Sequence, residues 1–332
     1  MVCVRRPEEQ KESPAEKGSG MLTHRFRCVW MLLCLTLLTA CGGTSGVQSA
    51  TTRSPAPTFT STPSPLPTAT LGPAPDHYNA HLLLQGNLHP DDLAFDLQGR
   101  LLFSDERNGT ISRLNADGTV TVLLRGLPGP EGIVVLGDGT MIIAEQTTHS
   151  IASLAPGAST PVVIRKLPGT PSTARCKDGV DGIAFDPTTN TLIIPDSPTG
   201  EVYRLSLDGQ TLTLLASGLV RPVGAAVDGQ GVIYVADECG GALWKITPSG
   251  EKTRIGGFGM LDDVAFDPQG DILVTDLQAN IHALIRLNLA TGKRQTLASD
   301  GFIEPQGLAV DTQGDIYVSD DVADRIVEYT PG

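Results

Sequence analysis

The sequence predicts an all-β fold, a six-bladed β-propeller, from three observations. One phrase recurs six times: a polar residue, an apolar run, a turn containing Asp or Gly, a second apolar run and a final acid. Successive copies start 40, 50, 42, 39 and 44 residues apart, and a strand-rich period near 43 is typical of one four-stranded blade per repeat. The last copy lacks an outer strand, whereas an unassigned strand-like run precedes the first. The copies begin at Asp91, Glu131, Asp181, Val223, Asp262 and Gln306.

The first element, residues 1–40, is expected to be a lipoprotein signal peptide. The apolar run 28–40 is shorter than the roughly 20 residues of a membrane-spanning helix and fits the core of a secretory signal. Leu38-Thr39-Ala40-Cys41 resembles the lipobox of bacterial lipoproteins, which implies cleavage before Cys41 and acylation of its thiol. An ordinary secreted protein with an incidental Cys is the alternative. Met21 is the more natural start, because residues 1–20 are polar and add nothing to a signal.

Residues 41–75 are rich in Ser, Thr, Pro, Ala and Gly, which predicts a disordered tether. The chain is therefore expected outside the cytoplasm, in contact with the membrane through its lipid anchor only.

Residues 76–332 should form one propeller, which leaves no room for a second domain. They hold 17 Lys and Arg against 33 Asp and Glu, a net charge of −16. That charge excludes a nucleic-acid partner, which needs a basic face. It suits a monomeric domain that meets a small molecule, a cation or a basic partner.

The inner strand of each blade is expected to combine small and bulky positions. The fourth phrase position is small in five of six copies, as in Ala94 and Ala226, and suits a crowded axis. The next position is large, as in Phe95 and Phe266, and should pack between blades. The Asp that follows, as in Asp267-Pro268-Gln269-Gly270, predicts a type I turn.

Ring closure is predicted from the two ends of the repeat array. The sixth copy stops soon after its third strand, 325–329. The run 80–85 (AHLLLQ) should therefore supply its outer strand, because closure buries both free edges.

Acids that recur in every blade are expected to serve the fold. The second strand of each blade ends in an acidic residue. These six acids should cap loops by accepting hydrogen bonds from the backbone. They are Asp105, Glu145, Asp196, Asp237, Asp276 and Asp320.

The first phrase position departs from the sixfold symmetry and is the candidate site. Four of its six residues are carboxylates that should enter the central tunnel from one rim: Asp91, Glu131, Asp181 and Asp262. Such carboxylates repel one another unless they are protonated or bind a cation, and all-oxygen ligands favour calcium. A water-filled polar channel mouth without metal is the alternative.

The repeats GIAFDPTTNTLIIPDS and GLAVDTQGDIYVSDD resemble NHL repeats and the senescence-marker-protein/gluconolactonase superfamily over residues 80–332. The resemblance implies a divalent cation at the tunnel mouth, with Asp91 as the first acid and Asp262 as both ligand and base. The Asp91-Asp92 and Asp262-Asp263 pairs are also similar to the calcium site of paraoxonase-like lactonases. Val223 stands where the gluconolactonase superfamily carries an Asn ligand.

The expected function is a metal-dependent lactone or ester hydrolase acting on a small molecule. The alternative is a non-catalytic NHL-type module that binds a protein or glycan on its loop-rich face; a lyase acting on a cyclic ester is a weaker third option. His89 and His149 should lie near the carboxylate rim, and we assign neither a role. No Gly-x-Ser-x-Gly elbow, phosphate loop or zinc-type spacing occurs in the sequence.

Two further features belong to the same face. Cys176 and Cys239 lie in loops of adjacent blades, and the sequence allows either a disulfide or two free thiols. The long step before the third copy contains the basic stretch 165–177 (RKLPGTPSTARCK). It is interpreted as a lid, an anion-recognition loop or a tolerated insertion.

Overall fold

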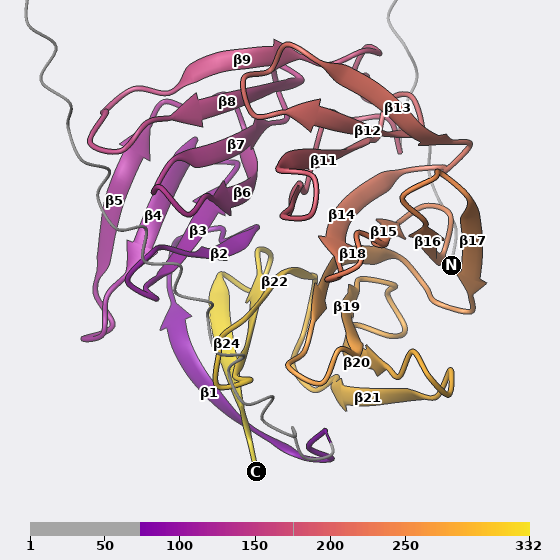
Figure 1. The fold of residues 1–332 in the computed structure, drawn as a ribbon. Helices are drawn as coiled ribbons and strands as arrows, with labels where there is room; N and C mark the ends of the chain where they lie inside the picture. Colours follow the sequence, from indigo (N-terminus) through magenta and orange to yellow (C-terminus); the bar gives the residue numbers. More distant parts are fainter. Residues whose placement is uncertain (1–73, 175) are drawn as a thin grey trace, which may run out of the picture. The chain divides into compact units, whose positions relative to one another are not determined.

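The computed structural model describes residues 74–174 and 176–332. The signal peptide, Cys41 and most of the tether fall outside these residues, so the predictions about them are untested. The described chain forms six antiparallel four-stranded sheets arranged as blades around an axis (Figure 1), as predicted. It contains no helix, and thus no helix long and apolar enough to cross a membrane.

Each of blades 1 to 5 runs outward in chain order, from an inner strand to an outer edge strand. The strands of blades 1 to 3 are β2 (Leu93–Phe95), β3 (Leu101–Asp105), β4 (Thr110–Leu114), β5 (Val120–Arg125), β6 (Pro130–Val135), β7 (Met141–Glu145), β8 (Ser150–Leu154), β9 (Val162–Lys166), β10 (Ala184–Asp186), β11 (Thr191–Asp196), β12 (Glu201–Ser206) and β13 (Leu212–Ser217). Those of blades 4 to 6 are β14 (Pro222–Val227), β15 (Ile233–Asp237), β16 (Ala242–Ile246), β17 (Lys252–Gly256), β18 (Leu261–Phe266), β19 (Ile272–Asp276), β20 (Ala283–Leu287), β21 (Arg294–Ala298), β22 (Pro305–Val310), β23 (Ile316–Asp320), β24 (Arg325–Pro331) and, as the outer strand, β1 (Tyr78–Gln85).

The predicted turn between the first two strands is present and is held by its Asp. In blade 5 the Asp267 carboxylate accepts the backbone N–H groups of Gln269 and Asp271. Gly270 follows with φ of +85°, a conformation that costs glycine little. Equivalent Asp side chains organise the turns of the other blades that carry them, as at Asp228.

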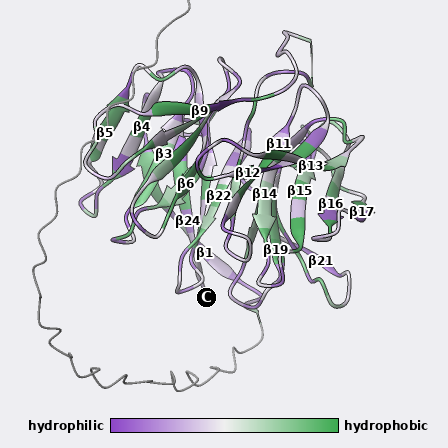
Figure 2. Ribbon diagram, turned by 45° about the horizontal axis from the view of Figure 1, so that its top comes forward, coloured by the Kyte–Doolittle hydropathy of each residue, from purple (hydrophilic) through white to green (hydrophobic). Residues whose placement is uncertain are grey.

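Apolar side chains hold adjacent blades together. The rings of Phe95 (blade 1) and Tyr317 (blade 6) meet edge to face with centroids 5.2 Å apart, and Tyr234 and Phe266 repeat this between blades 4 and 5 at 5.6 Å. This confirms the predicted inter-blade position of the bulky residues. The hydrophobic colour lies mainly on the strands and the hydrophilic colour on many of the connecting loops (Figure 2).

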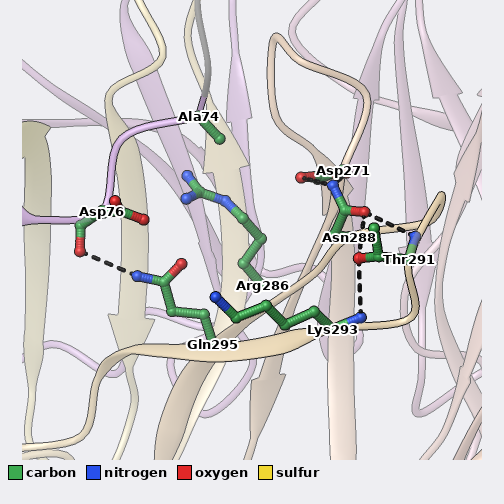
Figure 3. A pocket seen from close by; sticks show the side chains of 8 residues that line it. All are labelled: Ala74, Asp76, Asp271, Arg286, Asn288, Thr291, Lys293 and Gln295. Carbon is green, nitrogen blue, oxygen red and sulfur yellow. Dashed lines mark hydrogen bonds between the residues drawn. The ribbon is translucent and has the colours of Figure 1, made fainter.

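The ring closes as the sequence predicts, by antiparallel pairing of β1 with β24. Blade 5 adds a second attachment for the N-terminal segment. The buried Arg286 donates to the carbonyl oxygen of Pro75 at 2.6 Å and contacts the Tyr78 hydroxyl, and it forms an ion pair with Asp267. Arg286 also lines a polar cavity of about 230 Å³ together with Asp76, Asp271 and Gln295 (Figure 3), at the end of blade 5 that carries its β18–β19 and β20–β21 turns.

Candidate functional site

The first two phrase positions leave the strand ladder in every blade. In blades 2, 4, 5 and 6 the pairing of the first two strands shifts register over residues 131–132, 223–224, 262–263 and 306–307. In blades 1 and 3 the first strand begins only after the pair, at Leu93 and Ala184. Such irregularities re-aim side chains, and here they place acidic side chains of both positions around one cavity, whereas Val223 packs into an apolar cluster.

The second phrase position forms a closed collar. A Cβ atom added to Gly132 would lie 2.9 Å from the Cα of Gly182, and one added to Gly182 would lie 2.9 Å from the Cα of Gly224. The blades therefore approach too closely for side chains at these positions. Blades 1 and 5 carry Asp92 and Asp263 instead, and each reaches the glycine-bearing segment of the next blade. Asp92 accepts the N–H of Ile133 at 2.6 Å, and Asp263 accepts that of Leu308 at 2.9 Å.

The structure brings together all four predicted site carboxylates. Asp91, Asp181 and Asp262 line one cavity, together with Asp92, Asp263 and collar glycines. Glu131 joins them through a hydrogen bond with Asp91. The cavity measures about 10 Å³, room for roughly one water molecule or ion. We call these six side chains the axial carboxylates: Asp91, Asp92, Glu131, Asp181, Asp262 and Asp263.

Burial raises the pKa of every axial carboxylate, and in most of them neighbouring acids add to the shift. The pKa of Asp91 lies well above its usual range because of burial and the charge of Asp181. Burial and the charges of Asp181 and Asp91 do the same to the pKa of Asp262. Burial raises the pKa of Asp263 to about 7, although two backbone N–H groups oppose the shift. At neutral pH the cluster thus needs protons or a positive charge.

One positive charge is built into the cluster. Arg221, on the loop that enters blade 4, bonds both carboxylate oxygens of Asp178 at 2.8 and 2.9 Å. It also reaches Asp181 at 3.1 Å and forms an ion pair with Glu238. Its charge lowers the pKa of Asp181 and of Asp262 against the effect of burial.

Sequence reasoning missed Arg221 as a site residue. The available signal was its place two residues before Val223, the start of the one copy with an apolar first position. Asp92 and Asp263 were noted only through a family resemblance. Their signal was the second phrase position, which is Gly in the other four copies.

The recurring acids at the ends of the second strands do cap loops. Asp276, for example, accepts the backbone N–H groups of Gly259, Met260 and Gln278. All six are buried, and only Glu145 accepts from hydroxyl groups, those of Thr148 and Ser150, rather than from backbone.

The two histidines near this face have structural partners. Nδ1 of His149 accepts the N–H of Val180 at 3.0 Å while Nε2 lies 2.6 Å from the carbonyl oxygen of Pro168, so this buried ring pins the long loop before blade 3. Nδ1 of His89 lies 2.8 Å from a carboxylate oxygen of Asp324. Lys177 of the basic stretch donates to the carbonyl oxygen of Pro198.

Cys176 and Cys239 form a disulfide, with Cα atoms 6.1 Å apart. The bond is one wall of a groove of about 460 Å³ over blades 4 and 5. Glu238, three glycines, Met260 and Gln278 complete its lining, and Met260 is two residues from Asp262. Apart from Glu238, which is paired with Arg221, no lining residue is charged.

The axial donors fit a hard cation in kind, because all are carboxylate oxygens. Across residues 74–174 and 176–332, however, no three His, Cys, Asp or Glu side chains stand ready as a metal shell. A cation would have to draw the axial carboxylates together.

No family model matches this sequence, and no curated protein matches it. Solved structures share its fold. A gluconolactonase from Xanthomonas campestris superposes with a TM-score of 0.63 at 16% identity, over 77% of this chain and 90% of its own. Virginiamycin B lyase from Staphylococcus aureus superposes with a TM-score of 0.59 at 16% identity, over 76% of this chain and 99% of its own. A chain of a nidogen/laminin complex superposes with a TM-score of 0.57 at 19% identity, over 70% of this chain and 93% of its own. This chain is thus a six-bladed propeller with gluconolactonase-like and lyase neighbours.

Proposed function

We propose that this chain is an extracytoplasmic, lipid-anchored propeller that binds a divalent cation, calcium, on its axis and hydrolyses a lactone or ester. One observation carries the proposal: five carboxylates line one small axial cavity, a sixth, Glu131, bonds one of them, and the described residues place a single cation, Arg221, beside them. Buried carboxylates without counter-charge are costly. A second positive charge would remove that cost.

Asp91, Glu131, Asp181 and Asp262 would hold the cation. When bound, a divalent cation polarises a carbonyl group and lowers the pKa of bound water. Asp262 is the proposed general base, since a carboxylate whose pKa is raised above its usual range is a better proton acceptor.

The groove over blades 4 and 5 would bind the part of the substrate that does not react. Its mixed lining of disulfide, Met260, Gln278 and glycine backbone favours a neutral molecule with an apolar portion. The net charge of −16 on residues 76–332 disfavours an anionic one. The gluconolactonase likeness supports the lactone class, and the lyase likeness supports a cyclic ester.

A non-catalytic module that binds a protein or glycan on the loop-rich face is the second candidate. Two observations favour it: the axial cavity admits little more than one water molecule, and blade 4 offers Val223 where a ligand would be expected. The nidogen/laminin neighbour carries the same fold.

Calcium titration of the chelator-stripped full chain tests the cation. A ligand that binds only the native state stabilises it, by about 2.7 kcal/mol at a hundredfold excess over Kd, so the Tm should rise. A Tm that stays constant at millimolar calcium would reject the cation site.

A panel of neutral lactones and aryl esters then tests the chemistry. Asp262→Asn should lower kcat by roughly 10²- to 10⁴-fold, whereas Asp300→Asn, an exposed acid outside the site, should leave it unchanged. No turnover with any member, despite calcium binding, would favour the binding module.

A further inference from the structure

The disulfide joins the two loops that carry Asp178 and Glu238, the acids that bind Arg221. Cys176 is two residues before Asp178, and Cys239 directly follows Glu238. Asp178 holds Nε and one terminal nitrogen of the guanidinium, while Glu238 pairs with the other. The disulfide is therefore two residues from Asp178 in one loop and one residue from Glu238 in the other. It closes a clamp of these two loops around Arg221.

The clamp fixes the arginine where the axial carboxylates have a gap. Blade 4 contributes Val223 at the first phrase position, which supplies no oxygen. Arg221 enters from the same blade, and its side chain is 12% exposed. It reaches Asp181 at 3.1 Å, and its charge acts on Asp262. The positive charge therefore enters from one of the two blades that supply no carboxylate at this position, the other being blade 6 with Gln306.

A guanidinium in this position opposes a second cation. It neutralises Asp181, one of the four candidate ligands, and repels any positive charge placed beside that residue. Its several donors are spread over three carboxylates, so small movements do not release it.

We propose that Arg221 is the resident counter-ion of the axial carboxylates, stapled in place by the Cys176–Cys239 disulfide, and that it competes with the divalent cation. Its identification as a competitor rests on the proposed function; its place as counter-ion rests on the contacts alone. Arg221 is a positioning residue, because it sets the charge and arrangement of Asp181 and Asp262.

Calcium binding to the full-length Arg221→Gln variant tests this role. Without calcium the variant should have a lower Tm than wild type, because three acids lose their partner. Its calcium Kd, measured by calorimetry at pH 7.5, should fall by about tenfold or more through loss of repulsion. Calcium should also raise its Tm by more than it raises that of wild type.

Arg204→Gln is the matched control. Arg204 forms an ion pair with the fully buried Asp186 at 2.8 Å, in blade 3 and away from the axial cavity. This variant should lose stability and keep the calcium Kd of wild type. Arg221→Lys, which retains the charge, should bind calcium more weakly than Arg221→Gln.

The outcomes separate the two proposals. Calcium binding by Arg221→Gln but not by wild type would support the counter-ion and reject a natural cation site. Equal affinities would support the cation site and overturn the competitor. Absence of binding in both would overturn the cation site and the competitor, and a calcium-free Arg221→Gln variant with the Tm of wild type would overturn the counter-ion.

A charge-conserving double variant, Cys176→Ser with Cys239→Ser, covers the case in which Arg221→Gln does not fold. It frees the two arms of the clamp and leaves every charge in place. Its calcium Kd should be severalfold lower than that of wild type, because a looser guanidinium is displaced more easily. An unchanged or higher Kd would overturn the stapled competitor.

Discussion

Two sets of six carboxylates lie on the same side of the ring, and they differ in what surrounds them. The capping acids, such as Asp276, receive several donors from neighbouring loops. Asp92 and Asp263 among the axial carboxylates also accept backbone N–H groups, but Asp91 bonds another acid, Glu131, and the charges of Asp181 and Asp91 act on Asp262. Burial is common to both sets, so burial alone does not mark a site. The neighbouring charges do: an acid that receives donors from the loops it caps serves the fold, whereas buried acids that raise one another's pKa values mark a candidate ligand site.

The largest expected difference between the sets is in stability. Asp276→Ala would leave three backbone N–H groups without an acceptor, and should lower the free energy of unfolding by about 3 kcal/mol or more. Urea denaturation of the full chain measures the loss. The exposed Asp300→Ala should change it by less than about 0.5 kcal/mol. A small loss at Asp276 would mean that the capping acids do not hold the loops.

Substitution of an axial carboxylate should raise, rather than lower, the stability of the metal-free protein. Asp262→Asn removes one of several repelling charges, so at pH 8 it should raise the free energy of unfolding by roughly 1 kcal/mol. The same variant should lose most of the calcium-dependent rise in Tm. A destabilised variant would show that Asp262 behaves like a capping acid.

The smallest expected effect is the pH dependence of the whole chain without metal. Carboxyl groups whose pKa is raised by folding bind more protons in the native than in the unfolded state, so stability falls as pH rises from about 4. For Asp263 the loss should be complete just above its native pKa of about 7, and the other axial carboxylates, whose pKa values are also raised, add to the loss. We expect the Tm to drop by several degrees between pH 5 and pH 8, and calcium to reduce the drop. Asp263→Asn should flatten the profile, and a flat wild-type profile would contradict the raised pKa values.

The residues predicted correctly from the sequence are those that occupy the same position in each copy of the repeat, because such residues lie at equivalent places in each blade. Phe95 and Phe266 occupy one phrase position, and both pack against a tyrosine of an adjacent blade. Departures from the repeat identified the four candidate carboxylates, of which Asp91, Asp181 and Asp262 line the axial cavity and Glu131 bonds Asp91. The prediction did not reach Asp178, whose partner Arg221 is 43 residues away in another blade.

The sequence by itself determined the six blades, their turns, the closing strand and the axial position of Asp91, Glu131, Asp181 and Asp262. These follow from local periodicity, because each copy folds with the same hydrogen-bond pattern. Only the tertiary structure decided that Arg221 neutralises part of the cluster, that Cys176 pairs with Cys239, and that the collar leaves space for about one ion. Those features depend on contacts between blades, and their distances are set by how the sheets pack around the axis rather than by any repeat taken alone.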